Sequence, residues 1–203
     1  MKIALVEPEP TFNAYYFARL PMLGPLYLGT ILKQRGHEVR VLSGCLEKVY
    51  DRRRKWLHPA ILEADVVGLT ALTASAPSAY EIADEVRRQR PGTKILLGGP
   101  HASYVWEEAA QHADVVVRGE GEPAIIEAVE QAPRGSVLDG ALVDDLDTLP
   151  IPDLSLLGAA ERRMTMATLS ASRGCPHGCN FCVVSRLFGR KHRARSPEAV
   201  LDE

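Results

Sequence analysis

Five short apolar runs rich in β-branched residues recur along the first two thirds of the chain. They are Ile3–Val6, Val39–Leu42, Val66–Leu69, Ile95–Leu97 and Val115–Val117. None shows the apolar–polar alternation of a half-exposed sheet, which predicts parallel strands covered on both faces. Helical patterns lie between them, such as the stripe of Ala79, Ile82, Ala83 and Val86. This alternation predicts an α/β domain over residues 1–132, with a flavodoxin- or Rossmann-like five-stranded parallel sheet.

Beyond this domain the pattern loosens and then starts again. Residues 133–163 are predicted to be a linker with one short strand near Ala141–Val143. A strand-like run follows at Met164–Ala171, and Ser196-Pro197-Glu198 is typical of a helix start with serine as N-cap. The chain stops within about two helical turns of that start. We therefore expect residues 164–203 to be the truncated beginning of a second domain.

Composition excludes several classes of function. The residues are 46% hydrophobic and 25% charged, and the formal net charge is -2, so no strong field favours nucleic acid or an anionic membrane. The uncharged stretch Leu20–Leu32 is short for a membrane span and is interrupted by proline and glycine. Three of the four cysteines crowd together instead of forming a dispersed disulfide framework, which predicts a cytoplasmic protein with a metal site.

The crowded cysteines form a C-x-x-x-C-x-x-C motif at Cys175, Cys179 and Cys182. Thiolates are soft ligands that suit iron–sulfur clusters or zinc. Three ligands so close in sequence require a loop around one centre, and neighbouring glycine and proline residues supply its turns. On a four-iron cluster, three protein ligands leave one iron without a protein ligand, so that a substrate can bind to it. Catalytic zinc sites differ from structural ones in the same way, because they keep one coordination position open.

Zinc is the alternative metal for this motif. It would need a fourth ligand, for which the chain offers His177, His192 or Cys45. None of these residues has the customary spacing of paired zinc ligands. Cys45 is predicted instead to be a small, partly buried apolar side chain.

With Phe181 directly before its last cysteine, the motif resembles the radical SAM signature. The resemblance implies that Cys175, Cys179 and Cys182 hold a [4Fe-4S] cluster and that Phe181 lies beside bound S-adenosylmethionine. In that family the open iron chelates S-adenosylmethionine, and one electron cleaves it to a 5′-deoxyadenosyl radical. The resemblance also implies an external electron donor of the flavodoxin or ferredoxin type, and a strand and helix around the motif that begin a βα barrel.

Ligands of open parallel sheets bind outside the carboxyl ends of the strands. The loops expected there are Glu7–Met22, Thr70–Pro77, Gly98–Ser103 and Gly119–Glu122. The pair Gly98-Gly99 directly follows the fourth run, and paired glycines let a ligand approach the backbone closely. Thr70 and Thr73 place hydroxyl groups at the end of the third run.

This half of the chain resembles the cobalamin-binding domain that precedes radical SAM barrels. Thr70-Ala71-Leu72 matches the S-x-L part of that family's signature with threonine for serine, and Gly98-Gly99 matches its G-G part. Aligning Gly24 with the D-x-H-x-x-G part puts Arg19 and Pro21 where aspartate and histidine belong, so no histidine lower ligand to cobalt is expected. The implied cobalamin contacts are Thr70, Leu72, Thr73, Gly98, Gly99, His101, Gly119, Glu120 and Gly121. For His101, a packing or hydrogen-bonding role is the alternative.

The run Gly119-Glu120-Gly121-Glu122-Pro123-Ala124 also fits the G-x-G-x-x-A pattern of a nicotinamide or flavin site. That pattern belongs in the first strand–helix turn, not the fifth, and two carboxylates here would repel a pyrophosphate. An R-G-E-G-E stretch is typical of the cobalamin family at this point. We expect it to line the corrin edge or the linker, with an ordinary helix-start turn as the alternative.

Two functional hypotheses follow. The first is a cobalamin-dependent radical SAM enzyme that transfers a methyl group to an unactivated carbon of a small molecule, or oxidises or rearranges it. The second is a cobalamin-binding carrier or sensor without catalytic activity. Only 40 residues follow Arg163, whereas a complete βα barrel needs about 200 or more. We therefore expect this chain not to turn over by itself.

Overall fold

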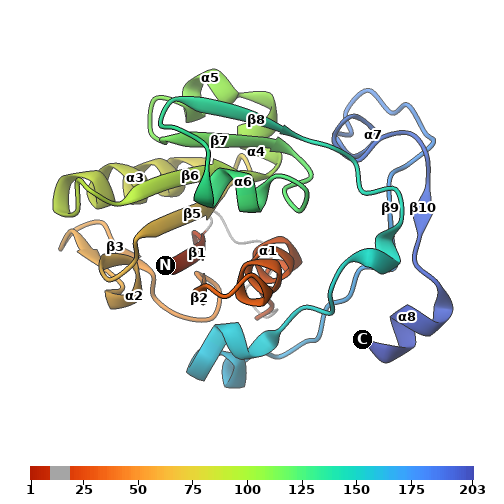
Figure 1. Ribbon diagram of the computed structural model, residues 1–203, viewed down its shortest axis with the longest axis horizontal. Helices are drawn as coiled ribbons and strands as arrows, with labels where there is room; N and C mark the ends of the chain where they lie inside the picture. Colours follow the sequence, from red (N-terminus) through yellow and green to blue (C-terminus); the bar gives the residue numbers. More distant parts are fainter. Residues whose placement is uncertain (10–18) are drawn as a thin grey trace.

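A wholly parallel six-stranded sheet forms the centre of the molecule (Figure 1), in the order β2-β1-β5-β6-β7-β8. The computed structural model describes residues 1–9 and 19–203. The strands of the sheet are β1 (Lys2–Glu7), β2 (Glu38–Ser43), β5 (Val66–Thr70), β6 (Lys94–Gly98), β7 (Val115–Gly119) and β8 (Ser136–Gly140). All five apolar runs are strands of this sheet, which confirms the predicted α/β class.

The sixth strand differs from the prediction. The sequence pattern places a short strand at Ala141–Val143 within a linker, whereas β8 lies at Ser136–Gly140 and pairs with β7. The sheet therefore continues past residue 132 and has six strands, not five. As an edge strand, β8 has one neighbour and is only half-buried, so its residues need not form the continuous apolar run that marks a central strand.

Helices cover both faces of the sheet. Side chains of α2 (Pro59–Leu62), α3 (Ala76–Gln89), α4 (Gly99–Tyr104) and α5 (Trp106–Ala109) join one buried core. Side chains of α1 (Leu23–Gln34), α6 (Ile125–Glu130) and the 3-10 segment η2 (Leu154–Arg163) join the core on the opposite face. The stripe predicted on α3 is fully buried, and α1 ends before Gly36, which adopts a φ of 96°. No helix in the described residues is long and apolar enough to cross a bilayer.

Smaller elements decorate this core. A short antiparallel pair, β3 (Tyr50–Asp51) and β4 (Trp56–Leu57), follows β2, and the 3-10 turn η1 (Leu146–Thr148) follows β8. The C-terminal part lies beside the sheet (Figure 1) and contains α7 (Val184–Leu187) and α8 (Pro197–Asp202). The predicted start of α8 is confirmed, since the Ser196 side chain accepts a hydrogen bond from the Ala199 amide.

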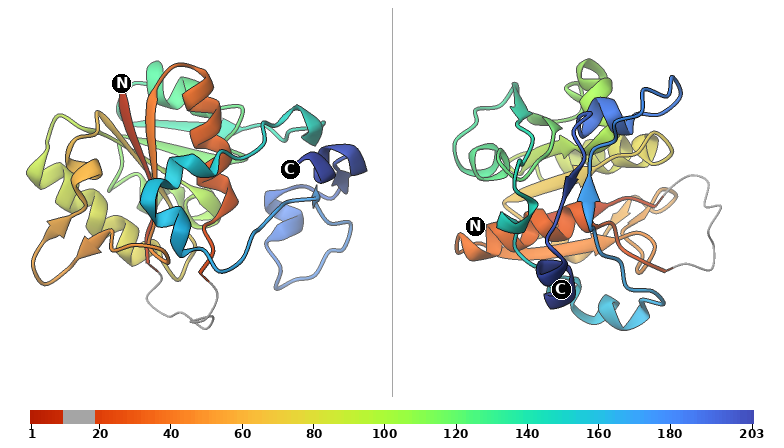
Figure 2. Two further views of the ribbon diagram at one scale, coloured as in Figure 1. Left: turned by 90° about the horizontal axis from the view of Figure 1, so that it is seen from below. Right: turned by 90° about the vertical axis from the view of Figure 1, so that its right-hand side faces the viewer.

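The residues around the cysteine motif form a narrow ribbon. Its strands β9 (Ser172–Arg173) and β10 (Arg193–Ala194) pair antiparallel and run side by side in Figure 2. The strand-like run at Met164–Ala171 forms no strand, because it has no neighbouring strand within the described residues to receive its backbone hydrogen bonds. The antiparallel ribbon therefore differs from the strand and helix of a βα barrel that the resemblance implies around the motif.

Candidate ligand-binding site

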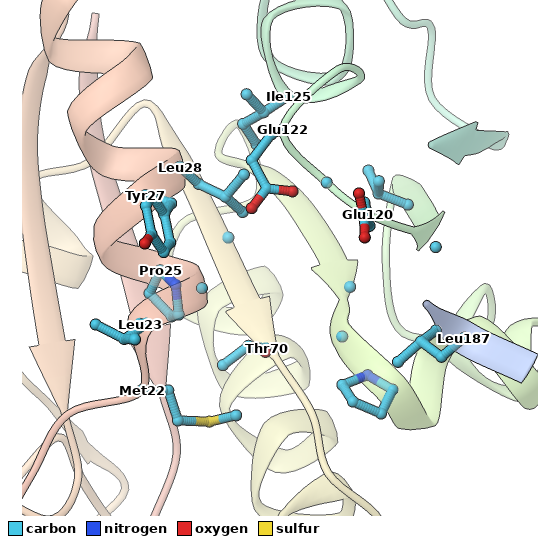
Figure 3. A pocket seen from close by; sticks show the side chains of 18 of the residues that line it. Met22, Leu23, Pro25, Tyr27, Leu28, Thr70, Glu120, Glu122, Ile125 and Leu187 are labelled. Atoms are coloured by element: carbon cyan, nitrogen blue, oxygen red, sulfur yellow. The ribbon is translucent and has the colours of Figure 1, made fainter. Parts of the chain in front are cut away.

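A cavity of about 450 Å³ opens at the carboxyl edge of the sheet. Its floor comes from the ends of β1, β5, β6 and β7, and one wall comes from the start of α1. Residues of the C-terminal part line it from the other side, and Figure 3 shows Leu187 across the cavity from α1. This volume is in the usual range for small-molecule sites, about 300–1,000 Å³. The predicted position of a ligand, outside the strand ends, coincides with this cavity.

The cavity lies where the strand order reverses. The chain passes from β1 outward to β2 and then crosses to β5 on the other side of β1. Connections leaving β1 and β5 therefore diverge to opposite faces of the sheet, and a crevice remains between them. Val6 of β1 and Thr70 of β5 both line the cavity.

The double glycine after β6 is shaped by its contact with the loop after β5. Gly99 has a φ of +89°, and a Cβ atom added there would lie 2.6 Å from Thr70 Oγ1 and 3.0 Å from the Ala71 nitrogen. The Ala71 amide donates to the Gly98 carbonyl at 3.0 Å, which joins the two loops. Only glycine combines this backbone conformation with so close an approach.

Ser103 joins a third loop to the same point. Its hydroxyl donates to the Gly99 carbonyl at 2.9 Å and accepts from the Gly119 amide at 3.0 Å. The loops after β5, β6 and β7 are thus connected by hydrogen bonds along one edge of the cavity.

The structure brings together six of the nine predicted cobalamin contacts along the cavity, namely Thr70, Gly98, Gly99, Gly119, Glu120 and Gly121. Leu72, Thr73 and His101 are not among the lining residues. His101 Nδ1 lies 3.2 Å from Thr73 Oγ1, and its ring lies 6.1 Å from that of Tyr80. This arrangement agrees with the packing and hydrogen-bonding alternative for His101.

Sequence reasoning missed the apolar wall of the cavity. Met22, Leu23, Tyr27 and Leu28 contribute from the start of α1 (Figure 3). The sequence signal for this wall is the uncharged stretch Leu20–Leu32, whose apolar residues lie at the start of α1. Residues 10–18 of the loop 7–22 lie outside the described part of the chain, whereas Arg19, Pro21 and Gly24, which align with the first part of the cobalamin signature, lie within it.

Glu7 holds the start of α1 against the end of β1. Its carboxylate accepts from the Met22 amide at 3.0 Å and from the Ser43 hydroxyl at 2.8 Å. The Cys45 thiol lies 3.5 Å from the same carboxylate and donates to the Leu20 carbonyl at 3.0 Å. Burial raises the pKa of Glu7, and the hydrogen bonds from Met22, Ser43 and Cys45 only partly oppose this shift.

The raised pKa of Glu7 predicts a pH-dependent stability. In the window above the ordinary glutamate pKa of 4.5, the folded chain retains a proton that unfolding releases. The free energy of unfolding must therefore fall as pH rises through this window. We expect Glu7→Gln to flatten that fall in urea unfolding curves recorded between pH ~4.5 and ~7.5. The exposed Glu63→Gln should keep the wild-type profile, and equal profiles for both variants would contradict the assignment.

The three cysteines of the motif are not gathered into a metal site. Cys175 and Cys182 are half-buried, Cys179 is exposed, and the Phe181 side chain is 92% exposed. Across residues 1–9 and 19–203, no three histidine, cysteine, aspartate or glutamate side chains lie close enough to hold a metal ion. Three thiol groups are suitable ligands for an iron–sulfur cluster, but these three do not converge on one point where a cluster could bind.

The acidic residues after β7 are engaged in ion pairs. The Glu120 carboxylate is fully buried and pairs with Arg193 at 2.6 Å, and that of Glu122 pairs with Arg173 at 2.6 Å. The helix α6 begins only at Ile125 and has six residues. The amide groups of a helix N-terminus, which could bind a pyrophosphate, are therefore not located at Gly121. This arrangement argues against the nicotinamide or flavin alternative.

A doubly wound parallel sheet with a mainly apolar cavity at its switch point defines an α/β ligand-binding domain. The family model of the B12 binding domain matches residues 13–129. The chain therefore belongs to the B12-binding domain family, which confirms the resemblance inferred from its motifs.

Relatives of this chain have longer sequences. An uncharacterized methyltransferase from Pyrococcus horikoshii is 29% identical, and the match covers 100% of this chain and 50% of that protein. The bacteriochlorophyllide d C-8(2)-methyltransferase from Chlorobaculum tepidum is 34% identical over 67% of this chain and 32% of its own length. The chain thus spans half or less of the curated relatives it matches.

A solved structure shares the fold. The cobalamin-dependent S-adenosylmethionine radical enzyme OxsB, with aqua-cobalamin bound, aligns with a TM-score of 0.73 and 20% identity. The alignment covers 98% of this chain and 30% of that one. At this level of identity the likeness shows that the architecture is the same.

Proposed function

We propose that this chain is the cobalamin-binding part, together with the cluster-bearing loop, of a cobalamin-dependent radical SAM enzyme of the methyltransferase type. The observation that carries the proposal is the apolar cavity at the carboxyl edge of the sheet in a member of the B12-binding domain family. The relatives named as methyltransferases and the cobalamin-bound radical enzyme support it. The C-x-x-x-C-x-x-C motif adds the donor set for a [4Fe-4S] cluster.

The residues of the cavity fit a corrin in two respects. Gly98 and Gly99 line one edge of the cavity with backbone atoms alone, so a flat ring can approach the backbone there. The side chains of Met22, Leu23 and Leu187 offer apolar surface and exclude water around the bound group. Cobalamin and S-adenosylmethionine would supply the methyl-transfer and radical chemistry, and the role of this chain would be to bind, orient and shield them.

The carrier or sensor hypothesis retains one specific observation in its favour. The thiols of Cys175, Cys179 and Cys182 do not converge, whereas the cavity at the carboxyl edge of the sheet is formed. Metal binding often completes the folding of its own site, so the enzyme hypothesis expects iron to gather these residues. A small-molecule substrate, an external electron donor and a cytoplasmic location belong to the enzyme hypothesis as proposals.

Anaerobic reconstitution tests the two hypotheses. The purified chain is incubated with iron, sulfide and hydroxocobalamin, desalted, and examined by absorption and electron paramagnetic resonance spectroscopy. A bound corrin with an iron–sulfur signal supports the enzyme, and a corrin without iron supports the carrier. Absence of bound corrin after desalting would refute both.

A further inference from the structure

Two arginines face each other across the ribbon that precedes and follows the cysteine motif. Arg173 of β9 pairs directly with Arg193 of β10. Like charges directly opposite on neighbouring strands destabilise the pair. The ribbon has only two residues in each strand, so it needs opposite charges from elsewhere to keep this register.

Those opposite charges come from the loop after β7. The Glu120 carboxylate binds Arg193 through both oxygens, at 2.6 Å and 3.1 Å, and lies 3.6 Å from Arg173. Glu122 binds Arg173 at 2.6 Å. The exposed fractions are 0% and 7% for the two glutamate side chains, and 2% for Arg193 and 12% for Arg173. The two carboxylates and the two guanidinium groups are thus largely shielded from water, and they form ion pairs mainly with one another.

Further contacts connect the charged side chains to segments that line the cavity or lie beside it. The Val143 amide donates to Glu120 at 2.7 Å, and Arg193 donates to the Phe188 carbonyl at 2.8 Å and to the Val143 carbonyl. The Arg173 guanidinium lies 5.5 Å from the centre of the Tyr27 ring on α1. Arg173 therefore spans from the loop after β7 to the opposite wall of the cavity.

The ribbon closes the loop 174–192, which contains all three cysteines of the motif. Gly174 has a φ of +86°, and a Cβ atom there would clash with the Lys191 carbonyl oxygen. The Cys175 amide donates to the Gly189 carbonyl at 3.1 Å. Residues at both ends of the loop, including Gly174, Leu187 and Phe188, line the cavity.

We propose that Glu120 and Glu122 are positioning residues that hold both ends of the cysteine loop, so that this loop covers the cavity at the carboxyl edge of the sheet. We call the four residues Glu120, Glu122, Arg173 and Arg193 the charged latch. Its two carboxylates belong to the loop after β7, and its two arginines belong to the ribbon. The latch therefore holds the loop that carries the cysteines in place beside the cavity. Its effect on cobalamin rests on the proposed function, whereas its hold on the loop does not.

Limited proteolysis of the full chain without cobalamin tests the hold on the loop. Glu122→Gln keeps the shape of the side chain but removes the nearer carboxylate at 2.6 Å and leaves Arg173 only the Glu120 carboxylate at 3.6 Å. Trypsin should then cleave at the exposed residues Arg186, Arg190 and Lys191 about tenfold faster than in the wild type, because the loop opens more often. The matched control is Glu81→Gln, which breaks the surface pair with Arg52 and should leave the cleavage rate unchanged.

The cleavage rate of a double variant shows whether Glu122 and Arg173 act as a pair or independently. Glu122→Gln/Arg173→Gln removes both charges and should be cleaved no faster than the more sensitive single variant. Additive acceleration would contradict a paired latch. Cleavage that spreads to Arg87 and Arg88 on α3 would also overturn the proposal, because the carboxylates would then stabilise the whole fold instead of this loop.

Titration with hydroxocobalamin, followed by absorption, tests the covering role. Glu122→Gln should weaken binding about tenfold relative to both wild type and Glu81→Gln. Faster proteolysis with unchanged affinity would overturn the covering role, and unchanged proteolysis would overturn the latch. If the wild type binds no hydroxocobalamin, the proposed function fails, while the proteolysis result still decides whether the carboxylates hold the loop.

Discussion

Replacement of Gly99 by valine is expected to lower the affinity for hydroxocobalamin by more than about 100-fold and to destabilise the fold by about 2–4 kcal/mol. The Gly99 backbone has a φ of +89°, which a β-branched residue adopts only with strain. The added Cβ would also lie 2.6 Å from Thr70 Oγ1, so the loops after β5 and β6 must separate. Both loops line the cavity. Absorption titration and urea unfolding measure the two effects.

Gly92→Val is the matched control. Gly92 lies in the turn before β6, and an added Cβ would meet no atom within 4 Å. This variant should bind hydroxocobalamin as the wild type does. Wild-type affinity in Gly99→Val would show that the double glycine does not shape the binding site, and the proposed approach of the corrin to the backbone there would be wrong.

Replacement of Cys179 by serine is expected to reduce the iron of the anaerobically reconstituted chain from about four atoms to less than about one. A serine hydroxyl is a harder and far less acidic ligand than a thiol, so two remaining thiolates would have to retain the cluster. Hydroxocobalamin binding should persist, because Cys179 does not line the cavity. Iron and zinc are measured by elemental analysis.

Cys45→Ser provides the control within the same chain. The Cys45 thiol donates to the Leu20 carbonyl and lies beside Glu7, far in sequence from the motif. This variant should keep its iron. Unchanged iron in Cys179→Ser, or zinc in place of iron in the wild type, would exclude the proposed cluster and favour the carrier hypothesis.

Much of the fold was predictable because its signals are local. Val66–Leu69 and Ile95–Leu97 are continuous apolar runs, and a strand covered on both faces needs such a run whatever its neighbours are. β8 was misplaced because an edge strand is held by pairing with β7, which no local pattern records. The same holds for the ribbon of β9 and β10, whose two-residue strands are too short to leave a periodic signal.

The candidate site divides in the same way. Gly98 and Gly99 were predicted to lie at the cavity because a double glycine after a strand indicates a close backbone approach. His101 was included because it lies in the same loop, yet the short helix α4 directs its ring toward Thr73 and Tyr80. A position in a loop does not fix the direction of a side chain, because that direction depends on the turn of the element that carries it.

The sequence alone determined the α/β class, the edge of the sheet where the cavity lies, and the family resemblance. Each depends on residue type and spacing along the chain. Only the tertiary structure decided the partners of Glu120 and Glu122, because Arg193 is 73 residues from Glu120 and Arg173 is 51 residues from Glu122. Charges so far apart in sequence find each other only after the sheet has placed the loop after β7 against the ribbon, where burial strengthens their attraction.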